Sequence, residues 1–101
     1  MAGRLQLQEE LERLLERDSV YFQPPATVAL RYPAIVYSRS DIVNNFADNL
    51  VYNQYDRYKV ITISRDPDDS IVRKISLMPT CRFETYYAKD GLNYNVFEIY
   101  Y

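Results

Sequence analysis

Residues 58–64, YKVITIS, have the most regular β-strand pattern in the chain and decide how the rest of it is read. In a strand, Ile61 and Ile63 point to one side, and Tyr58, Val60 and Thr62 point to the other. A strand face that is freely solvated usually carries Lys, Glu, Thr or Ser. Apolar residues on both sides therefore indicate a sheet in which neither face is simply exposed to water.

The chain before this strand begins with extended segments. Pro24 and Pro25 exclude a helix from residues 20–30, because proline lacks an N–H donor and restricts the residue before it. Residues 34–39 are rich in β-forming side chains and read as a strand.

The two segments that follow are expected to differ in regularity. Residues 40–48, SDIVNNFAD, mix polar and apolar side chains without a period, which predicts a loop that is unusually apolar. Residues 50–64 are strand-like. Asp56 is expected to bend this stretch between a short piece and the firmer strand.

Residues 81–101 read as a β-hairpin. Asp90-Gly91 lies between two runs of β-forming residues, and this dipeptide is a strong turn signal. A loop of two residues would mix core and solvent positions on each face of the hairpin. A loop of three or five residues gathers the apolar side chains on one face.

We favour the longer loop, because the buried face chiefly decides strand register. It pairs Phe83 with Ile99 and leaves Glu84 opposite Glu98. Such a like-charge pair is destabilising, which is the drawback of this register. In it, the face opposite Phe83 carries four other side chains: Tyr86, Tyr94, Val96 and Tyr100.

Two helices complete the expected fold. Residues 4–17 place leucines at helical spacing, and residues from about 68 to 78 carry acidic residues at their start and Pro79 at their end. Their apolar faces are formed by Leu7, Leu11, Leu14 and Leu15 in the first and by Ile71 and Ile75 in the second.

These elements predict an α+β fold for residues 1–101 as a single domain. The sheet is mainly antiparallel, with about four to five strands: those within 34–64 and the hairpin 81–101. The N-terminal helix and the second helix pack on one face of this sheet. The opposite face is then left for solvent, for a covering segment such as residues 20–30, or for another protein.

The composition argues against most enzymes. The chain has 101 residues with 11 Tyr, no His and one Cys. Without His, imidazole general bases, Ser-His-Asp or Cys-His devices and ordinary zinc or haem sites are excluded. The carboxylates of Asp66, Asp68 and Asp69 suit helix capping better than a metal site, since no EF-hand spacing follows them. We expect no catalytic residue, no cofactor and no metal.

The charge pattern favours protein partners over nucleic acid or membrane. The formal net charge is -2, whereas phosphate binding usually requires a basic face. The chain contains no apolar stretch long enough to span a bilayer. Arg and Tyr are both enriched at protein interfaces. The candidate interface residues are Ile42, Val43 and Phe46 of the apolar loop, Tyr58, and the hairpin residues Tyr86, Tyr94 and Tyr100.

Three stretches of the chain resemble a family of small tail-terminator or tail-completion proteins of long-tailed bacteriophages. They are YFQPPATVALRYPAIVYSR at 21–39, ADNLVYNQYDRYKVITISRDPDDSI at 47–71 and CRFETYYAKDGLNYNVFEIYY at 81–101. The YFQPP, RYP-A-IVY, RDPD and terminal YY elements are uncommon sequences. Together the stretches cover most of the chain after the first helix.

The resemblance implies a structural role in the virion, made in the cytoplasm of a host bacterium. Such proteins form a ring with copies of themselves, typically a hexamer, at the head-proximal end of the tail. The ring contacts the major tail tube protein, stops its polymerisation and joins the tail to the head connector or head-completion protein. Genome DNA would pass through its lumen without sequence-specific binding, and no membrane is involved.

Other functions stay open at this stage. A head-completion or connector-stopper protein of the same virion has similar size and also forms rings. A small nucleic-acid-binding module could use Tyr stacking beside Arg. An enzyme working through carboxylates alone would need a second acidic motif beside residues 66–69, and none is evident.

Overall fold

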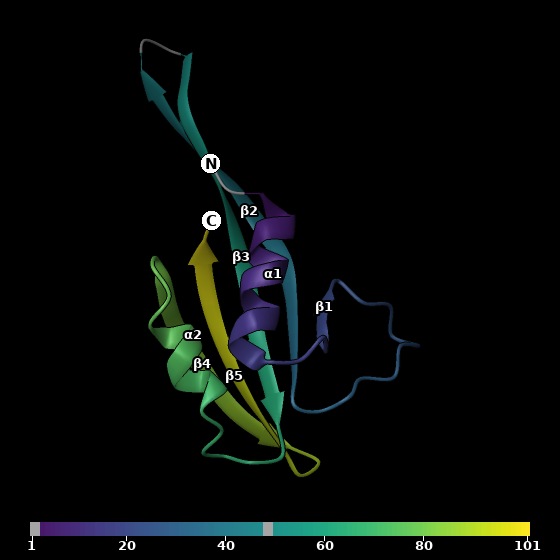
Figure 1. Cartoon of the computed structure of the whole chain (residues 1–101). Helices are drawn as coiled ribbons and strands as arrows, with labels where there is room; N and C mark the ends of the chain where they lie inside the picture. Colours follow the sequence, from purple (N-terminus) through teal and green to yellow (C-terminus); the bar gives the residue numbers. More distant parts are fainter. Residues whose placement is uncertain (1–2, 48–49) are drawn as a thin grey trace.

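The computed structural model describes residues 3–47 and 50–101 (Figure 1). Its elements are α1 (Arg4–Leu15), β1 (Val20–Phe22), β2 (Ala34–Ala47), β3 (Leu50–Ser64), α2 (Ile71–Ser76), β4 (Cys81–Lys89) and β5 (Leu92–Tyr100). The five strands form one sheet in the order β1-β2-β3-β5-β4, in which only β1 runs parallel to its neighbour. The predicted α+β fold with a mainly antiparallel sheet is confirmed.

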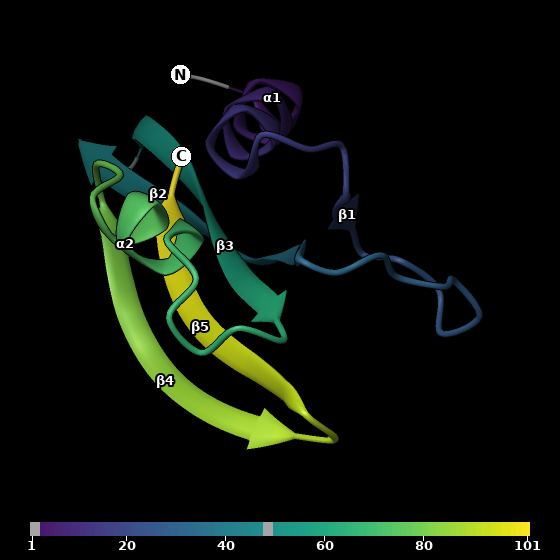
Figure 2. The same cartoon turned by 60° about the horizontal axis from the view of Figure 1, so that its bottom comes forward.

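Both helices lie on the same face of the sheet (Figure 2). α1 ends at Leu15 rather than at residue 17, because Glu16 adopts the left-handed conformation with φ 60°. α2 spans fewer residues than the predicted 68–78. The carboxylate of Asp69 accepts hydrogen bonds from the Ile71 N–H at 3.1 Å and from the Ser64 hydroxyl at 2.9 Å, so it ties the start of α2 to the end of β3.

The hydrophobic core lies between the helices and this face of the sheet. Its centre holds two tyrosines, and the Tyr37 hydroxyl donates to Gln8 of α1 at 2.5 Å. Thus the polar tip of a buried ring is satisfied, as burial requires. The core consists of Leu7, Leu11, Leu15, Val20, Ile35, Tyr37, Tyr58, Val60, Ile71, Ile75, Met78, Phe97 and Ile99.

The loop predicted at residues 40–48 is wrong over residues 40–47, which belong to β2. β3 likewise runs without a break, so the expected bend at Asp56 is also wrong. The pairing of β2 with β3 shifts register at two other positions. Ser40 is an extra residue of β2 between the pairs Arg39↔Tyr58 and Asp41↔Arg57, and Tyr52 is an extra residue of β3 between the pairs Asn45↔Asn53 and Phe46↔Val51. The missing period has a physical reason: this part of β2 has no core face to alternate against.

Residues 42–47 and 50–56 form a two-stranded arm that extends beyond the sheet (Figure 1). β5 accompanies β3 only from Ser64 back to Arg57, which pairs with Tyr100. At the next residue the Tyr101 N–H donates to the Asp56 carbonyl at 2.9 Å, and over residues 42–47 and 50–55 the strand pairs of β2 and β3 are with each other alone. The arm gives the described molecule its elongated dimensions of 51 × 26 × 23 Å.

The C-terminal hairpin has a two-residue turn, so the longer loop predicted for it is wrong. Asp90 and Gly91 have φ values of 54° and 76°, as a type I′ turn requires. A register shift at Glu84 separates the pairs Thr85↔Val96 and Phe83↔Phe97. This bulge aligns the apolar residues without lengthening the loop.

The arrangement predicts a sharp difference between two leucines of α1. Leu11 is fully buried, whereas Leu5 is 66% exposed. We expect Leu11→Ala to lower the free energy of unfolding by about 2–5 kcal/mol. The matched change Leu5→Ala should alter it by less than about 0.5 kcal/mol. Urea unfolding followed by circular dichroism measures both, and equal effects would contradict the packing described above.

Candidate interaction surfaces

The predicted interface residues do not gather on one surface. Ile42 and Val43 lie on the arm, as does the backbone of Phe46, which pairs with Val51. The side chain of Phe46 lies outside the described part of the chain. The remaining four residues divide between the core, the helix side of the sheet and the opposite face, and each is placed below.

Tyr58 is a core residue, so its assignment to an interface is wrong. Only 1% of it is exposed, because it packs beneath α1 among the apolar side chains of the helix face. Its ring meets Tyr37 edge-on at 6.0 Å between centroids. Its hydroxyl donates to Asp56 at 3.2 Å.

The root of the arm is held by charged side chains on both faces of the ribbon. On the helix face, Arg39 Nε lies 3.1 Å from an Asp56 carboxylate oxygen. The hydrogen bond between Arg39 and the Tyr58 hydroxyl, together with the nearby Asp56, raises the pKa of the guanidinium. On the other face, Arg57 lies 3.3 Å from Asp41.

Arg57 also connects the arm to the last strand of the body. Its Nε lies 3.8 Å from Glu98 of β5. These ion pairs on both faces lie where β5 ends, at the pair Arg57↔Tyr100. They join Arg39 to Asp56 and Arg57 to Asp41 and Glu98. Ion pairs therefore connect the root of the arm to the rest of the domain at the point where pairing with β5 ends.

The helix side of the hairpin carries a groove between α2 and β4, with a volume of about 600 Å³. Phe83 and Tyr86 are 54% and 50% exposed along it. Phe83 packs edge-on against Phe97 at 5.6 Å between ring centroids. We call this the α2–β4 groove; its lining includes Pro67, Val72, Arg73, Phe83, Tyr86 and Phe97.

Tyr86 lies on the same side as Phe83, so its predicted placement on the opposite face is wrong. The cause is the extra residue at Glu84, which reverses the alternation between residue 83 and residue 86. One feature of the sequence pointed to this bulge. Without a bulge the favoured register placed Glu84 opposite Glu98, whereas the observed register pairs Glu98 with Arg82.

The opposite face of the sheet carries Tyr94, as predicted from its alternation with Phe97. Tyr94 stacks on Tyr87 with 4.7 Å between centroids and 9° between ring planes. Burial, followed by the nearby Tyr32 and Tyr87, raises the pKa of the Tyr94 hydroxyl. Tyr100 occupies the same face near the arm root, opposite Arg57.

The segment after β1 lies against part of this opposite face. Pro24, Pro25 and Leu30 line a groove of about 290 Å³ with Ile61 and Tyr94. Of the three options considered for the face opposite the helices, the structure therefore shows a covering segment within residues 20–30. Covering is partial, since Tyr87 remains 44% exposed at the rim.

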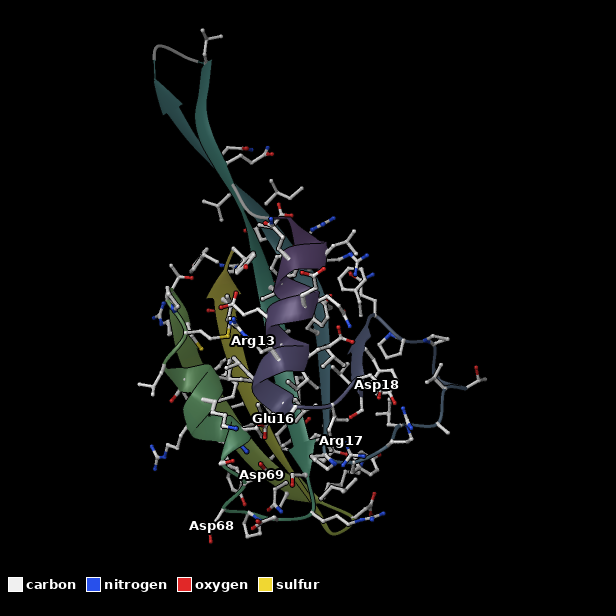
Figure 3. The ribbon with its side chains drawn as sticks, in the orientation of Figure 1. Arg13, Glu16, Arg17, Asp18, Asp68 and Asp69 are labelled. Atoms are coloured by element: carbon white, nitrogen blue, oxygen red, sulfur yellow. The ribbon has the colours of Figure 1, made fainter. Side chains whose placement is uncertain are left out.

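Charged residues near the end of α1 and before α2 are used in local contacts (Figure 3). Within the described ranges, no three His, Cys, Asp or Glu side chains are grouped so as to hold a metal ion. The contacts are Arg13 with Glu10, Glu16 with Lys74, Arg17 with the Tyr32 carbonyl, Asp18 with Arg31, and Asp69 with Ser64.

Two further findings bear on what the chain is. In the part of the chain that the structure covers, no helix is both long and apolar enough to cross a lipid bilayer. Comparison with protein-family models and with curated proteins gave no match.

The ion pairs of Arg57 at the root of the arm predict how the arm responds when this side chain is removed. We expect Arg57→Met to speed amide hydrogen exchange in residues 42–47 and 50–56, because it removes the contacts with Asp41 and Glu98. The unfolding temperature should stay close to that of the parent, since the arm contributes nothing to the described core. Lys59→Met, inside the part of β3 that β5 accompanies, is the control. Equal exchange in the two variants would refute the role of Arg57.

Proposed function

We propose that this protein is a structural tail-terminator protein of a long-tailed bacteriophage. It forms a ring of identical chains at the head-proximal end of the tail tube. The ring stops tube polymerisation and joins the tail to the head connector. The observation that carries the proposal is the arm, which extends an apolar and nearly uncharged ribbon away from the domain.

The composition of the arm is unlike that of a solvated hairpin. Residues 42–56, IVNNFADNLVYNQYD, contain two charged residues, Asp48 and Asp56 at the arm root, in a chain that is 26% charged. Ile42 and Leu50 are 48% and 72% exposed. A two-stranded ribbon is at best marginally stable alone in water, so such a ribbon gains most from burial against another protein.

The domain also offers surfaces in different directions, which suits a protein with several neighbours. The arm extends along the long axis, the α2–β4 groove opens on the helix side, and the Tyr87–Tyr94 pair lies on the opposite face. A ring subunit must contact two neighbours, the tube below and the connector above. Separate surfaces support this role better than a single binding pocket would.

The resemblance of three sequence stretches to phage tail-terminator proteins supports the same proposal. The first stretch covers the last two residues of β1 and the start of β2, the second covers β3 and reaches the first residue of α2, and the third is the β4–β5 hairpin. The slightly acidic chain fits a lumen through which DNA passes without being held.

The proposal is tested in the phage that encodes the chain, with the gene deleted and supplied from a plasmid. We expect tails of excessive length without the protein, and labelled protein at the head-proximal end of tails in its presence. Tails of normal length that lack heads would favour a connector-stopper instead. Absence of the protein from purified virions would overturn both assignments.

A matched pair of variants tests the part played by the arm. We expect the double change Ile42→Asp and Leu50→Asp to abolish complementation while leaving the thermal unfolding of the domain unchanged. Leu5→Asp is the control, because it adds a charge to a leucine whose exposure, 66%, lies between those of Ile42 and Leu50, at the first turn of α1, where acidic residues are well tolerated. Full complementation by the arm variant would contradict the proposal.

A further inference from the structure

We propose that the arm of one chain adds to the free edge of β4 in a second copy, which makes a head-to-tail contact between identical subunits. This inference rests on the proposed function, in that it names the partner of the arm. It concerns the backbone edges of the sheet as well as its side chains.

β4 is the open edge of the sheet. It is the last strand in the order, and every residue from Arg82 to Lys89 is exposed. Among the described residues, the backbone bonds of β4 outside the hairpin are limited to that of the Cys81 N–H with the Met78 carbonyl. An edge of this kind is a template for another strand.

The other edge of the sheet, formed by β1, is poorly suited to the addition of a strand. β1 has three residues and ends at Phe22. The next residue, Gln23, has φ 44° and is followed by Pro24 and Pro25. Proline has no N–H to donate and blunts an edge against pairing. Strand addition is therefore directed to β4.

The arm supplies a strand of matching length. Residues 42–47 span about 20 Å and residues 82–89 about 26 Å at roughly 3.3 Å per residue. Over the described residues 42–47 and 50–55, each arm strand pairs only with the other, so each has an unpaired outer edge. Pairing one of these edges with β4 satisfies backbone groups on both chains.

Charge favours this contact over the two symmetric ones. The arm sequence, residues 42–56, carries two anions, Asp48 and Asp56, and no cation, whereas residues 81–89 carry Arg82 and Lys89 against Glu84. Arm with arm and β4 with β4 would each join segments of like net charge. Arm with β4 joins opposite charges, and such complementarity sets which surfaces meet.

The side chains beside the β4 edge suit the same occupant. Phe83 and Tyr86 leave half of their surface exposed in the α2–β4 groove, next to that edge. A paired arm brings its own apolar residues, Ile42 and Leu50 among them, alongside these rings. The contact is heterologous, so repetition closes a ring or continues as a filament.

Cross-linking between two differently labelled proteins tests the contact. Both carry Cys81→Ser; one adds Asn44→Cys on the arm and the other adds Thr85→Cys on β4, and both positions are exposed. We expect a short bis-maleimide to join the two proteins when they are mixed, and neither protein to itself. Self-linking of Thr85→Cys would reveal β4 on β4, and self-linking of Asn44→Cys would reveal arm on arm. Either of these results, or no linking at all, overturns the proposal.

The oligomeric state gives an independent readout. We expect the full chain to self-associate at high concentration in sedimentation experiments. A chain with residues 43–54 replaced by a two-residue turn should remain monomeric, with circular dichroism confirming that it keeps its fold. A full chain that is monomeric throughout contradicts the self-contact. The virion and tail-length experiments would still stand in that case, with the arm bound to the tube protein instead.

Discussion

The pairing of β3 with β5 ends at Arg57 and Tyr100, and the architecture depends on that limit. Inside it, β3 has a partner on each side and a helix layer above, so its residues alternate between two covered faces. Outside it, the same strand has β2 as its partner and no core beneath it. One continuous strand thus serves two physical environments, and the ion pairs of Arg39 and Arg57 lie at the boundary between them.

This limit also explains what the sequence could and could not predict. The strand at 58–64 and the helix leucines follow a period because burial selects one face, and both were read correctly. Residues 42–47 have no buried face on their own chain, so nothing imposes a period on them. These residues resembled a loop because alternation in the sequence appears only where one face of a strand is buried against the rest of its own chain.

The hairpin shows a second kind of limit. Asp90-Gly91 predicts its turn well, because only residues that tolerate positive φ fit there. The extra residue at Glu84 leaves no comparable local mark, since it resolves a competition between turn geometry and the pairing of Phe83 with Phe97. As a result Tyr86 was assigned to the wrong face. Tyr58 was assigned to an interface because tyrosine is enriched there, but a tyrosine hydroxyl with a carboxylate partner is also stable in a core.

Because no described core residue comes from the arm, the residues that stabilise this domain and those proposed to recognise its partners belong to separate sets. Substitutions in residues 42–47 and 50–55 can then accumulate with little cost to folding, while substitutions beneath α1, or of Asp56, which accepts from the buried Tyr58 hydroxyl, cannot. Such a division permits rapid divergence of binding specificity on a conserved framework. In the tail-terminator role proposed above, the contacts with assembly partners would then evolve faster than the fold.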